Sequence, residues 1–320
     1  MKILVVGKKQ LMHWPETTAH FLVQKNQVKL FLYNKWTFSS IFYKFFSRKK
    51  RYQKCAEKLR CLIRSFQPDL IFYVSSFFIP KECYQILDEF PKIVRIGWVG
   101  DVFSQDAKER ADYLDILFCS DTGYLKDTQG FKCQSLYLPL CADETVFVNR
   151  HLPRTLPPFF VGIANDVRIS YLKAIKKTCL IYGRRWPKMP QHQIHNHRIS
   201  YRKAQDFINR SIAPININFS KNNINGLNFR VFEIPCCGGL ILMNDMPDLH
   251  LCYQVGKEAV VYRTPEELNL LIQDVLEFPE KYEKIAQAGY ERTLREHTYE
   301  KRLEQMMEIL KNKGLLHSEF

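Results

Sequence analysis

Short apolar runs alternate with longer, more polar segments along the first half of the chain. The runs are rich in β-branched and aromatic residues and are bounded by polar or turn residues, as buried parallel strands are. They lie at Lys2–Gly7, Val28–Tyr33, Asp69–Ser75, Ile93–Val99, Ile116–Cys119 and Ser135–Leu140. Segments that fit helices lie near Arg51–Ser65, Pro80–Phe90 and Ser104–Tyr113. This alternation predicts a doubly wound α/β domain.

A proline-rich segment, His151–Pro158, interrupts the alternation. Its three prolines exclude a helix and are typical of a linker. The alternation then resumes, with a helix from about Ser170, a long polar loop and a helix that carries Glu233. Thr264-Pro-Glu-Glu267 combines an N-cap, a proline at the first helical position and a capping-box glutamate. The strands predicted here are Phe159–Ala164, Thr178–Tyr182, Pro214–Phe219, Leu240–Asn244 and Ala259–Tyr262.

The whole pattern therefore predicts an α/β protein with two Rossmann-like domains, residues 1–153 and 154–297, and a last helix within 298–320. A chain of 320 residues is longer than a typical single core requires, which agrees with two domains. A short linker would place the carboxyl ends of both sheets across one cleft. Ligands bind at those ends in such sheets, so the function is expected in that cleft.

The helix that carries Glu233 has the most informative sequence. Arg230 lies three residues before Glu233, and the helix should end at Gly238-Gly239 and lead directly into a strand. Helix N-termini in such sheets favour anions, an arginine suits phosphate, and a carboxylate accepts hydrogen bonds from a pair of sugar hydroxyls. The alternative is a simple ion pair within the helix. The pattern favours a site for a nucleotide-linked sugar.

Charge is unevenly distributed along the chain, although the net charge is +14. Residues 1–100 have 18 Lys/Arg against 6 Asp/Glu, and residues 151–230 have 14 against 2. Two basic blocks suggest two anionic partners, or one partner that lies between the domains. No apolar run reaches the length of a membrane span, and no signal peptide is recognised, so a soluble cytoplasmic protein is expected. Ten scattered cysteines without a Cys-x-x-Cys motif do not support a zinc ribbon.

Several motifs in the second half, taken in their order and spacing, resemble the CgeB-type (spore-maturation-protein-like) glycosyltransferases, which have the two-domain GT-B fold. The similarity covers about residues 225–305. Phe160–Gly162 and Gly183–Trp186 fit more loosely, and Tyr137–Asp143 with Phe147 looks like the interdomain segment of that family. The motifs are Asn228–Glu233, Cys237–Leu242, Gly256–Glu258, Tyr262, Glu266–Leu268, Ala286–Gly289 and His297–Arg302.

This resemblance implies a transferase that moves a sugar from a nucleotide-sugar donor to an acceptor hydroxyl in the synthesis of a cell-surface glycan, glycolipid or glycoconjugate. The second domain would bind the donor and the first domain the acceptor, which could be a glycan, a lipid-linked molecule or a protein. Glu233 would contact the ribose of the donor. Related retaining enzymes carry a second glutamate seven residues earlier, where this chain has Gly226. Neither a cofactor nor a metal is expected, and no Asp-x-Asp tripeptide is present.

Six further residues are candidates for donor binding. Asn228, Phe229 and Gly162 lie in the motifs that carry the resemblance. Arg184 and Arg185 follow Gly183 at the end of a predicted strand, where a cation could neutralise the departing diphosphate. Tyr201 could stack on a nucleobase, although a packed aromatic is the more common outcome.

Two residues of the first domain are candidates for the catalytic base. Asp101 follows a predicted strand and should face the cleft, where an acceptor hydroxyl must lose its proton. The alternative for Asp101 is a helix N-cap. His13 lies in the first loop, and its alternative is packing against Trp14. His192, His195 and His197 could form a metal tract, but no nearby acid or cysteine completes it, which favours a polar loop.

The segment of residues 42–64 contains Phe42, Phe45 and Phe46, followed by a basic stretch. This segment could bind the anionic inner face of the cytoplasmic membrane, or it could be a solvated helix face. Nucleic acid is not expected as a partner, because no recognised reader motif accompanies the charge. Two other functions stay open: a nucleotide-sugar epimerase or hydrolase on the same fold, and a basic protein that binds nucleic acid or membrane.

Overall fold

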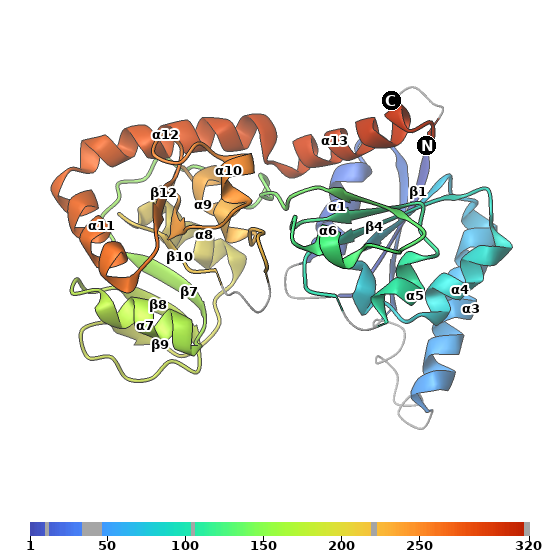
Figure 1. Cartoon of the computed structure of the whole chain (residues 1–320), viewed down its shortest axis with the longest axis horizontal. Coiled ribbons are helices and arrows are strands. Elements are labelled where there is room, and N and C mark those ends of the chain that lie inside the picture. Colours follow the sequence, from blue (N-terminus) through green and yellow to red (C-terminus); the bar gives the residue numbers. More distant parts are fainter. Residues whose placement is uncertain (10–12, 34–46, 104–105, 219–222, 317–320) are drawn as a thin grey trace. The chain divides into compact units, whose positions relative to one another are not determined.

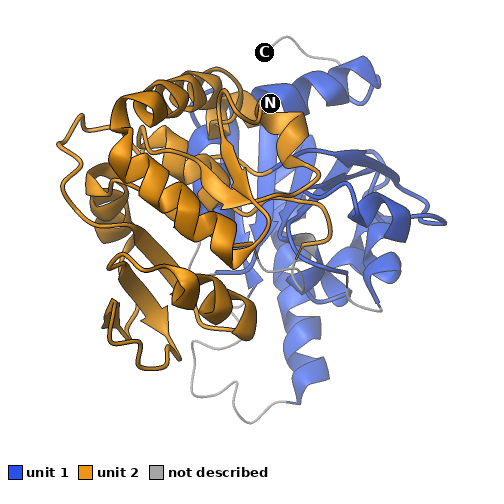
Figure 2. Cartoon of the chain, turned by 60° about the vertical axis from the view of Figure 1, so that its left-hand side comes forward, with its two compact units in different colours: residues 1–139, 303–320 blue, residues 140–302 orange. Residues whose placement is uncertain are grey.

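The computed structural model describes residues 1–9, 13–33, 47–103, 106–218 and 223–316. The chain divides into two compact units, which Figure 2 shows in different colours. Unit 1 contains Met1–Pro139 together with Leu303–Phe320, and unit 2 contains Leu140–Arg302. Each unit has its own parallel sheet and its own buried core. This is the α/β architecture that the alternation predicts.

Unit 1 is built on a six-stranded parallel sheet with the order β2-β1-β3-β4-β5-β6. All six predicted strands are present within one residue at the start and up to three at the end. The central strands are mostly apolar and buried, as in parallel sheets that are covered on both faces. The strands are β1 (Lys2–Gly7), β2 (Gln27–Leu32), β3 (Leu70–Val74), β4 (Val94–Val99), β5 (Ile116–Cys119) and β6 (Gln134–Tyr137).

The helices of unit 1 include one that the sequence did not predict, α1 (Trp14–Leu22). Pro15 lies in its first turn, where a proline needs no N–H partner. In α3 (Arg48–Phe66) the buried positions Cys55, Leu59 and Ile63 repeat every four residues. The predicted helix near residues 80–90 is α4 (Glu82–Gln85) followed by a 3₁₀ turn. The other helices are α5 (Ala107–Ala111), α6 (Tyr124–Asp127) and the part of α13 (Tyr299–Asn312) from Leu303 onwards.

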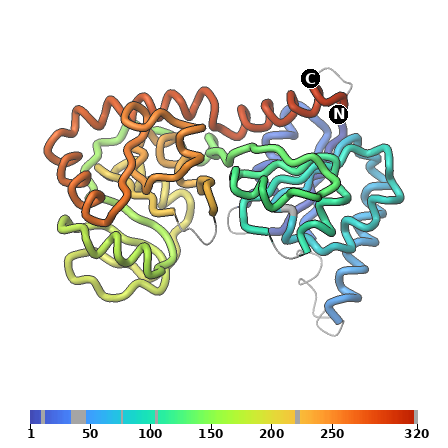
Figure 3. Tube along the Cα trace, in the orientation of Figure 1, coloured from blue at the N-terminus to red at the C-terminus, as the bar shows by residue number. Residues whose placement is uncertain are grey.

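Unit 2 contains two parallel three-stranded sheets, with the orders β9-β8-β7 and β10-β11-β12. A parallel bridge between Phe159 and Pro214 brings β7 beside the start of β10. The combined order is β9-β8-β7-β10-β11-β12. All neighbouring strands are parallel, but successive strands are added toward one edge from β7 to β9 and toward the other edge from β10 to β12, so the strand order reverses between β7 and β10. Figure 3 shows the path of the chain through this unit. The strands are β7 (Phe159–Ile163), β8 (Leu180–Arg184), β9 (Gln193–His195), β10 (Ile215–Asn216), β11 (Leu242–Asn244) and β12 (Val260–Tyr262).

The predicted long polar loop before β10 is wrong, because it contains β9 and the helix α8 (Tyr201–Arg210). The buried face of α8 includes the amides of Gln205 and Asn209, which hydrogen-bond to the Val148 carbonyl at 3.4 and 3.0 Å. The buried face of α8 is therefore not an unbroken apolar stripe in the sequence, and the helix could not be recognised from its hydrophobic pattern. The other helices of unit 2 are α7 (Asp166–Ala174), α9 (Arg230–Cys236), α10 (Leu249–Cys252), α11 (Pro265–Glu277) and α12 (Pro279–Glu296), shown in Figure 1.

The predicted cap of α11 is confirmed. Thr264 Oγ1 accepts a hydrogen bond from the Glu267 N–H at 3.1 Å, and the Glu267 carboxylate accepts one from the Arg263 N–H at 2.6 Å. None of the helices in the described ranges is long and apolar enough to cross a membrane.

The proline-rich segment 151–158 lies inside unit 2 and does not join the two units. The Arg154 guanidinium donates to the carbonyls of Ile208 and Ser211 at 3.0 Å, where α8 ends. It also donates to the carbonyls of Cys237 and Gly238, where α9 ends. We call this contact the Arg154 clamp. The border between the units is at Pro139–Leu140, fourteen residues before the predicted one at 153.

Candidate functional site

The candidate site of unit 2 lies where the direction of the strand order reverses, at the carboxyl ends of β7 and β10. Crevices at such reversals are where open α/β sheets bind their ligands. Helix α7 begins three residues after β7 and has Asn165 as its N-cap, whose Oδ1 accepts from the Arg168 N–H at 3.0 Å. Helix α9 begins with Arg230. Both helices therefore start near the same pair of strand ends.

Glu233 is a buried carboxylate beside Arg230. The side chain of Glu233 is 5% exposed, and Arg230 Nε lies 3.5 Å from its Oε2. Arg230 also donates from Nη1 to the Val161 carbonyl of β7 at 2.6 Å. Burial raises the pKa of Glu233 above its ordinary value, and the charge of Arg230 opposes this shift. The ion pair expected from the sequence is present, and it is anchored at the end of β7.

Arg168 is a second guanidinium close to this ion pair; it is one of the basic residues of the second domain, among which the sequence favoured Arg184 and Arg185 for the diphosphate. Its Nη1 donates to the Ile163 carbonyl at 2.9 Å, and it lies over the Phe160 ring at 5.7 Å. Burial, followed by the nearby charge of Arg230, lowers the pKa of Arg168 to about 10. The Asn-x-x-Arg spacing after a strand was the available signal. Two neighbouring guanidiniums, one of them paired with a buried carboxylate, form a site suited to a diphosphate.

Asn228 uses both ends of its amide within the protein. Its Oδ1 accepts from the Arg230 N–H at 3.0 Å, and its Nδ2 donates to Asn216 Oδ1 at 3.1 Å and to Asn218 Oδ1. Asn228 therefore orients the first turn of α9 against β10. Phe229, the N-cap residue of α9, is half-buried.

Tyr201 lies close to Glu233, and not in a loop as predicted. It is the first residue of α8, whose N-cap Ser200 accepts from the Lys203 N–H at 3.3 Å. The Tyr201 ring meets the Phe147 ring edge-on, with centroids 6.0 Å apart. Burial and then the charge of Glu233 raise the pKa of Tyr201. The Tyr201 ring is thus packed against Phe147 on one side, and the pKa of its hydroxyl is shifted by the charge of Glu233.

Gly162 of β7 is approached closely by β8 because the neighbouring residue of β8 is Gly183. A Cβ at Gly183, which has a φ of 153°, would lie 1.7 Å from the Gly162 carbonyl oxygen. That oxygen accepts from Trp186 Nε1 at 3.0 Å. Arg184 and Arg185 follow at the end of β8, and both are exposed.

The two candidate bases are in unit 1. His13 precedes α1 with a φ of 47°, and its Nδ1 lies 3.7 Å from Glu16 Oε1. Its neighbour Trp14 is buried edge-on against Trp98, with centroids 5.1 Å apart. Asp101 follows β4 by two residues and is partly exposed. Their catalytic roles stay a prediction.

The three histidines of the candidate metal tract each have another partner. His192 is buried between the Leu172 carbonyl and the Cys179 N–H, His195 stacks on Tyr182, and His197 contacts the Arg198 carbonyl. Within the described ranges, no three His, Cys, Asp or Glu side chains come together as metal ligands would. Every cysteine except Cys61 is buried.

Comparison with known protein families finds a similarity for part of the chain. Residues 168–308 match the family model described as glycosyl transferase-like, and this region includes Arg168, Arg230 and Glu233. No curated protein sequence matches the chain significantly.

Solved structures resemble the whole chain. Sucrose-phosphate synthase from Thermosynechococcus elongatus aligns with a TM-score of 0.70 at 12% identity, over 98% of this chain and 99% of that chain. Anabaena Alr3699/HepE in complex with UDP-glucose has a TM-score of 0.68 at 10% identity, over 98% and 100%. A putative UDP-N-acetylglucosamine 2-epimerase from Listeria monocytogenes has 0.62 at 9%, over 99% and 97%. The chain has the GT-B fold, and its residues 168–308 are similar to the glycosyl transferase-like family.

Proposed function

We propose that this protein transfers a sugar from a nucleotide-sugar donor to an acceptor hydroxyl, and that unit 2 binds the donor at the carboxyl ends of β7 and β10. The observation that carries the proposal is the buried carboxylate of Glu233 beside the half-buried guanidinium of Arg230, whose charge in turn acts on the half-buried guanidinium of Arg168. Such a charge arrangement is costly to bury unless it serves a ligand or a structural network. Its place at the reversal of the strand order favours a ligand.

Each group has a distinct role in this proposal. Arg168 and Arg230 bind the diphosphate and stabilise the negative charge that grows on it as the sugar leaves. Glu233 accepts hydrogen bonds from ribose hydroxyls. Asn228 positions α9, Tyr201 is the proposed contact of the nucleobase, and Arg184 and Arg185 are further candidates for neutralising the diphosphate. His13 and Asp101 are the proposed candidates for removing the proton of the acceptor, and no metal takes part.

Further parts of the proposal rest on similarity. The motifs between residues 225 and 305 favour a CgeB-type transferase, with a glycan, lipid-linked or protein acceptor in cell-surface glycan synthesis. The solved structure with UDP-glucose makes a uridine diphosphate sugar the first donor to test. Peripheral contact with an anionic membrane is proposed for the described part of the basic segment, α3; Phe42, Phe45 and Phe46 lie outside the described residues.

A thermal-shift screen tests the donor site. Uridine, guanosine, cytidine and adenosine diphosphate sugars are compared, and one of them should raise the melting temperature because it binds only the folded state. The shift should vanish in Glu233→Ala and persist in Glu308→Ala, which removes an exposed carboxylate of unit 1. A flat response to all four sugars would contradict the proposal.

The similarity to the putative epimerase favours a second candidate, a nucleotide-sugar epimerase on the same fold. The two functions differ in their need for an acceptor. Turnover of the nucleotide sugar by the protein alone, followed by NMR, would favour the epimerase. Turnover only with an added acceptor would favour the transferase.

A further inference from the structure

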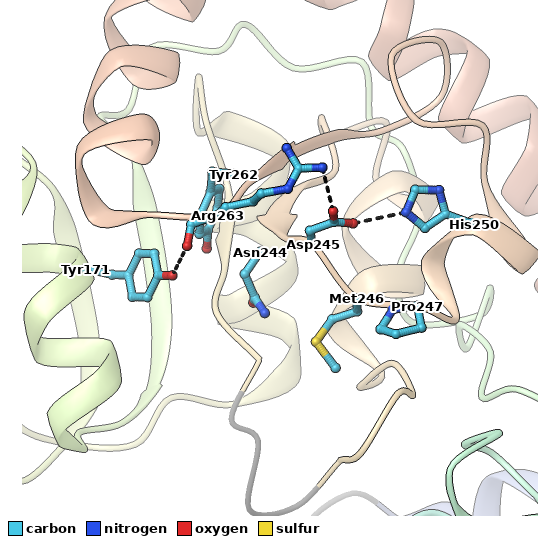
Figure 4. A pocket seen from close by; sticks show the side chains of 8 residues that line it. All are labelled: Tyr171, Asn244, Asp245, Met246, Pro247, His250, Tyr262 and Arg263. Atoms are coloured by element: carbon cyan, nitrogen blue, oxygen red, sulfur yellow. Dashed lines mark hydrogen bonds and ion pairs between the residues drawn. The ribbon is translucent and has the colours of Figure 1, made fainter.

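Unit 2 has a pocket of about 520 Å³ beside the candidate donor site, at the carboxyl ends of β11 and β12 (Figure 4). Its volume is in the range of small-molecule sites. Polar groups from four elements converge on it, together with an aromatic ring and a thioether. The residues used here are Tyr171, Asn244, Asp245, Met246, His250 and Arg263.

We propose that this pocket binds the sugar that is transferred, and that this sugar is a neutral hexose. The inference rests on the proposed function and adds the chemistry of the group on the donor. It concerns residues that the family resemblance did not single out, apart from the neighbouring Tyr262.

A chain of hydrogen bonds connects the pocket to the first turn of α9. Asn244 Oδ1 accepts from the Asn218 N–H at 2.7 Å. Asn218 Oδ1 in turn accepts from Asn228, whose Oδ1 holds the Arg230 N–H at 3.0 Å. Asn218 and Asn228 therefore link Asn244 in the pocket wall to the backbone N–H of Arg230, whose guanidinium belongs to the proposed diphosphate site. A sugar attached to that diphosphate is within reach of the pocket.

The order of the strands gives the direction of the donor. Helix α8, which carries Tyr201, packs on the β7 and β8 side, where Phe207 contacts Phe159 and Tyr182. The charge of Glu233, the proposed ribose contact, raises the pKa of Tyr201, so the two side chains belong to the same part of the site. The pocket lies on the opposite side of β10, at β11 and β12. With the diphosphate at Arg168 and Arg230, the nucleoside extends toward β8 and the sugar toward the pocket.

The polar groups of the pocket suit hydroxyls. Asp245 holds His250 Nε2 at 3.0 Å with one oxygen and Arg263 Nη2 at 2.9 Å with the other, as Figure 4 shows. A carboxylate fixed in this way can still accept hydrogen bonds through its remaining lone pairs. Because the Asp245 carboxylate is balanced by the Arg263 guanidinium, a neutral hexose fits better than an acidic sugar. The Tyr171 ring and the Met246 thioether supply apolar surface for a sugar ring.

The experiment compares a nucleoside diphosphate with its sugar ester, starting with UDP and UDP-glucose, by calorimetry on the whole chain. Asp245→Asn should weaken UDP-glucose about 10-fold while it changes UDP by less than about twofold, since only the sugar loses a charged acceptor. Asn244→Asp, which keeps the acceptor for Asn218 N–H and replaces the amide donor, should act in the same selective way. Asp274→Asn, an aspartate-to-asparagine change in a surface ion pair with Lys281, is the matched control.

The outcomes separate this inference from the proposed function. Equal weakening of UDP and UDP-glucose, or no weakening of either, in the two pocket variants would overturn the inference and leave the donor site intact. Failure of all four nucleotide sugars to bind the unaltered protein would overturn both. Circular dichroism of each variant confirms that it is folded before binding is measured.

Discussion

At the residue scale, the candidate site depends on a few buried charges. Glu233 and Arg230 could be predicted because they lie three residues apart before a Gly-Gly pair. Arg168 was harder to predict, since only its spacing from Asn165 after a strand separates it from the other basic residues between 151 and 230. Its importance comes from the end of β7, which brings it to the carbonyl of Ile163 and close to Arg230.

The raised pKa of Glu233 predicts how donor binding depends on pH. Protonation removes the acceptor for ribose hydroxyls, so the affinity for the donor should fall as the pH falls through a value above the ordinary carboxyl range. Calorimetry from pH 8 to pH 5 measures this. The Glu233→Gln variant should bind the donor about 10-fold more weakly at pH 8, and its affinity should not fall with protonation at this position. An identical pH profile in the two proteins would contradict the assignment.

His297 predicts an acid sensitivity of folding. It is buried between the Cys252 carbonyl and the Arg302 guanidinium, and burial with that charge lowers its pKa to about 3. Its contribution to the free energy of unfolding is complete above the unfolded pKa of about 6.5 and is lost as the pH falls toward 3. Between pH 6.5 and pH 5 the loss should be about 2 kcal/mol.

Urea denaturation at the two pH values measures this loss. In His297→Gln, which does not titrate, the difference between pH 6.5 and pH 5 should shrink by about the same amount. If the variant keeps the full pH dependence, other groups cause it.

At the element scale, every strand except β9 could be predicted, but the helices α1 and α8 could not. In α1 a proline in the first turn and a buried Thr18 obscure the pattern. In α8 buried amides replace apolar side chains at Gln205 and Asn209. Hydrophobic periodicity finds only elements that bury apolar groups. Elements that bury hydrogen-bonded polar groups become recognisable only when their partners are known.

The Arg154 clamp predicts a large effect from one substitution outside the candidate site. Arg154→Met leaves carbonyls at the ends of α8 and α9 without their donor, and the free energy of unfolding should fall by about 2–4 kcal/mol. Arg150→Met removes only a half-exposed ion pair with Asp206 and should change it by less than about 1 kcal/mol. Urea denaturation compares them, and equal effects would contradict the clamp.

Helix α3 predicts a membrane interaction. Glu89 pairs with Arg60 and Arg64, whereas Lys49 and Lys50 are exposed near the start of the helix. Lys49→Glu with Lys50→Glu should lower partitioning onto phosphatidylglycerol vesicles about 30-fold or more, because each basic residue contributes about 1 kcal/mol. Cosedimentation measures this. Lys176→Glu with Lys177→Glu has the same charge change in unit 2, and equal loss there would indicate nonspecific attraction.

At the scale of the whole molecule, two units with separate cores have separate tasks in the proposal. The last helix contributes Leu303, Met306 and Leu310 to the buried residues of unit 1, although it begins in unit 2. The chain thus passes from unit 1 to unit 2 and back. The two-domain organisation could be predicted from the alternation; the border could not, because a proline-rich segment can be fixed by a single arginine.

Hydrogen exchange tests the division of tasks. A nucleoside diphosphate that raises the melting temperature should slow exchange in peptides that cover residues 159–168 and 228–236, since it binds the ends of β7 and the start of α9. Mass spectrometry of the whole chain measures this. Slower exchange only in other parts of the chain, with no change in these two segments, would contradict the proposed donor site.

The position of the border has a practical consequence for engineering. Chimeric transferases are made by grafting the donor half of one enzyme onto the acceptor half of another, and the choice of junction decides whether the graft folds. Here a cut in the proline-rich stretch would separate Glu144 from the backbone N–H groups of Tyr299 and Glu300, and Asn149 from the helix end at Gly238. Grafts joined at Pro139–Leu140 and at Arg302–Leu303 would carry these contacts with them.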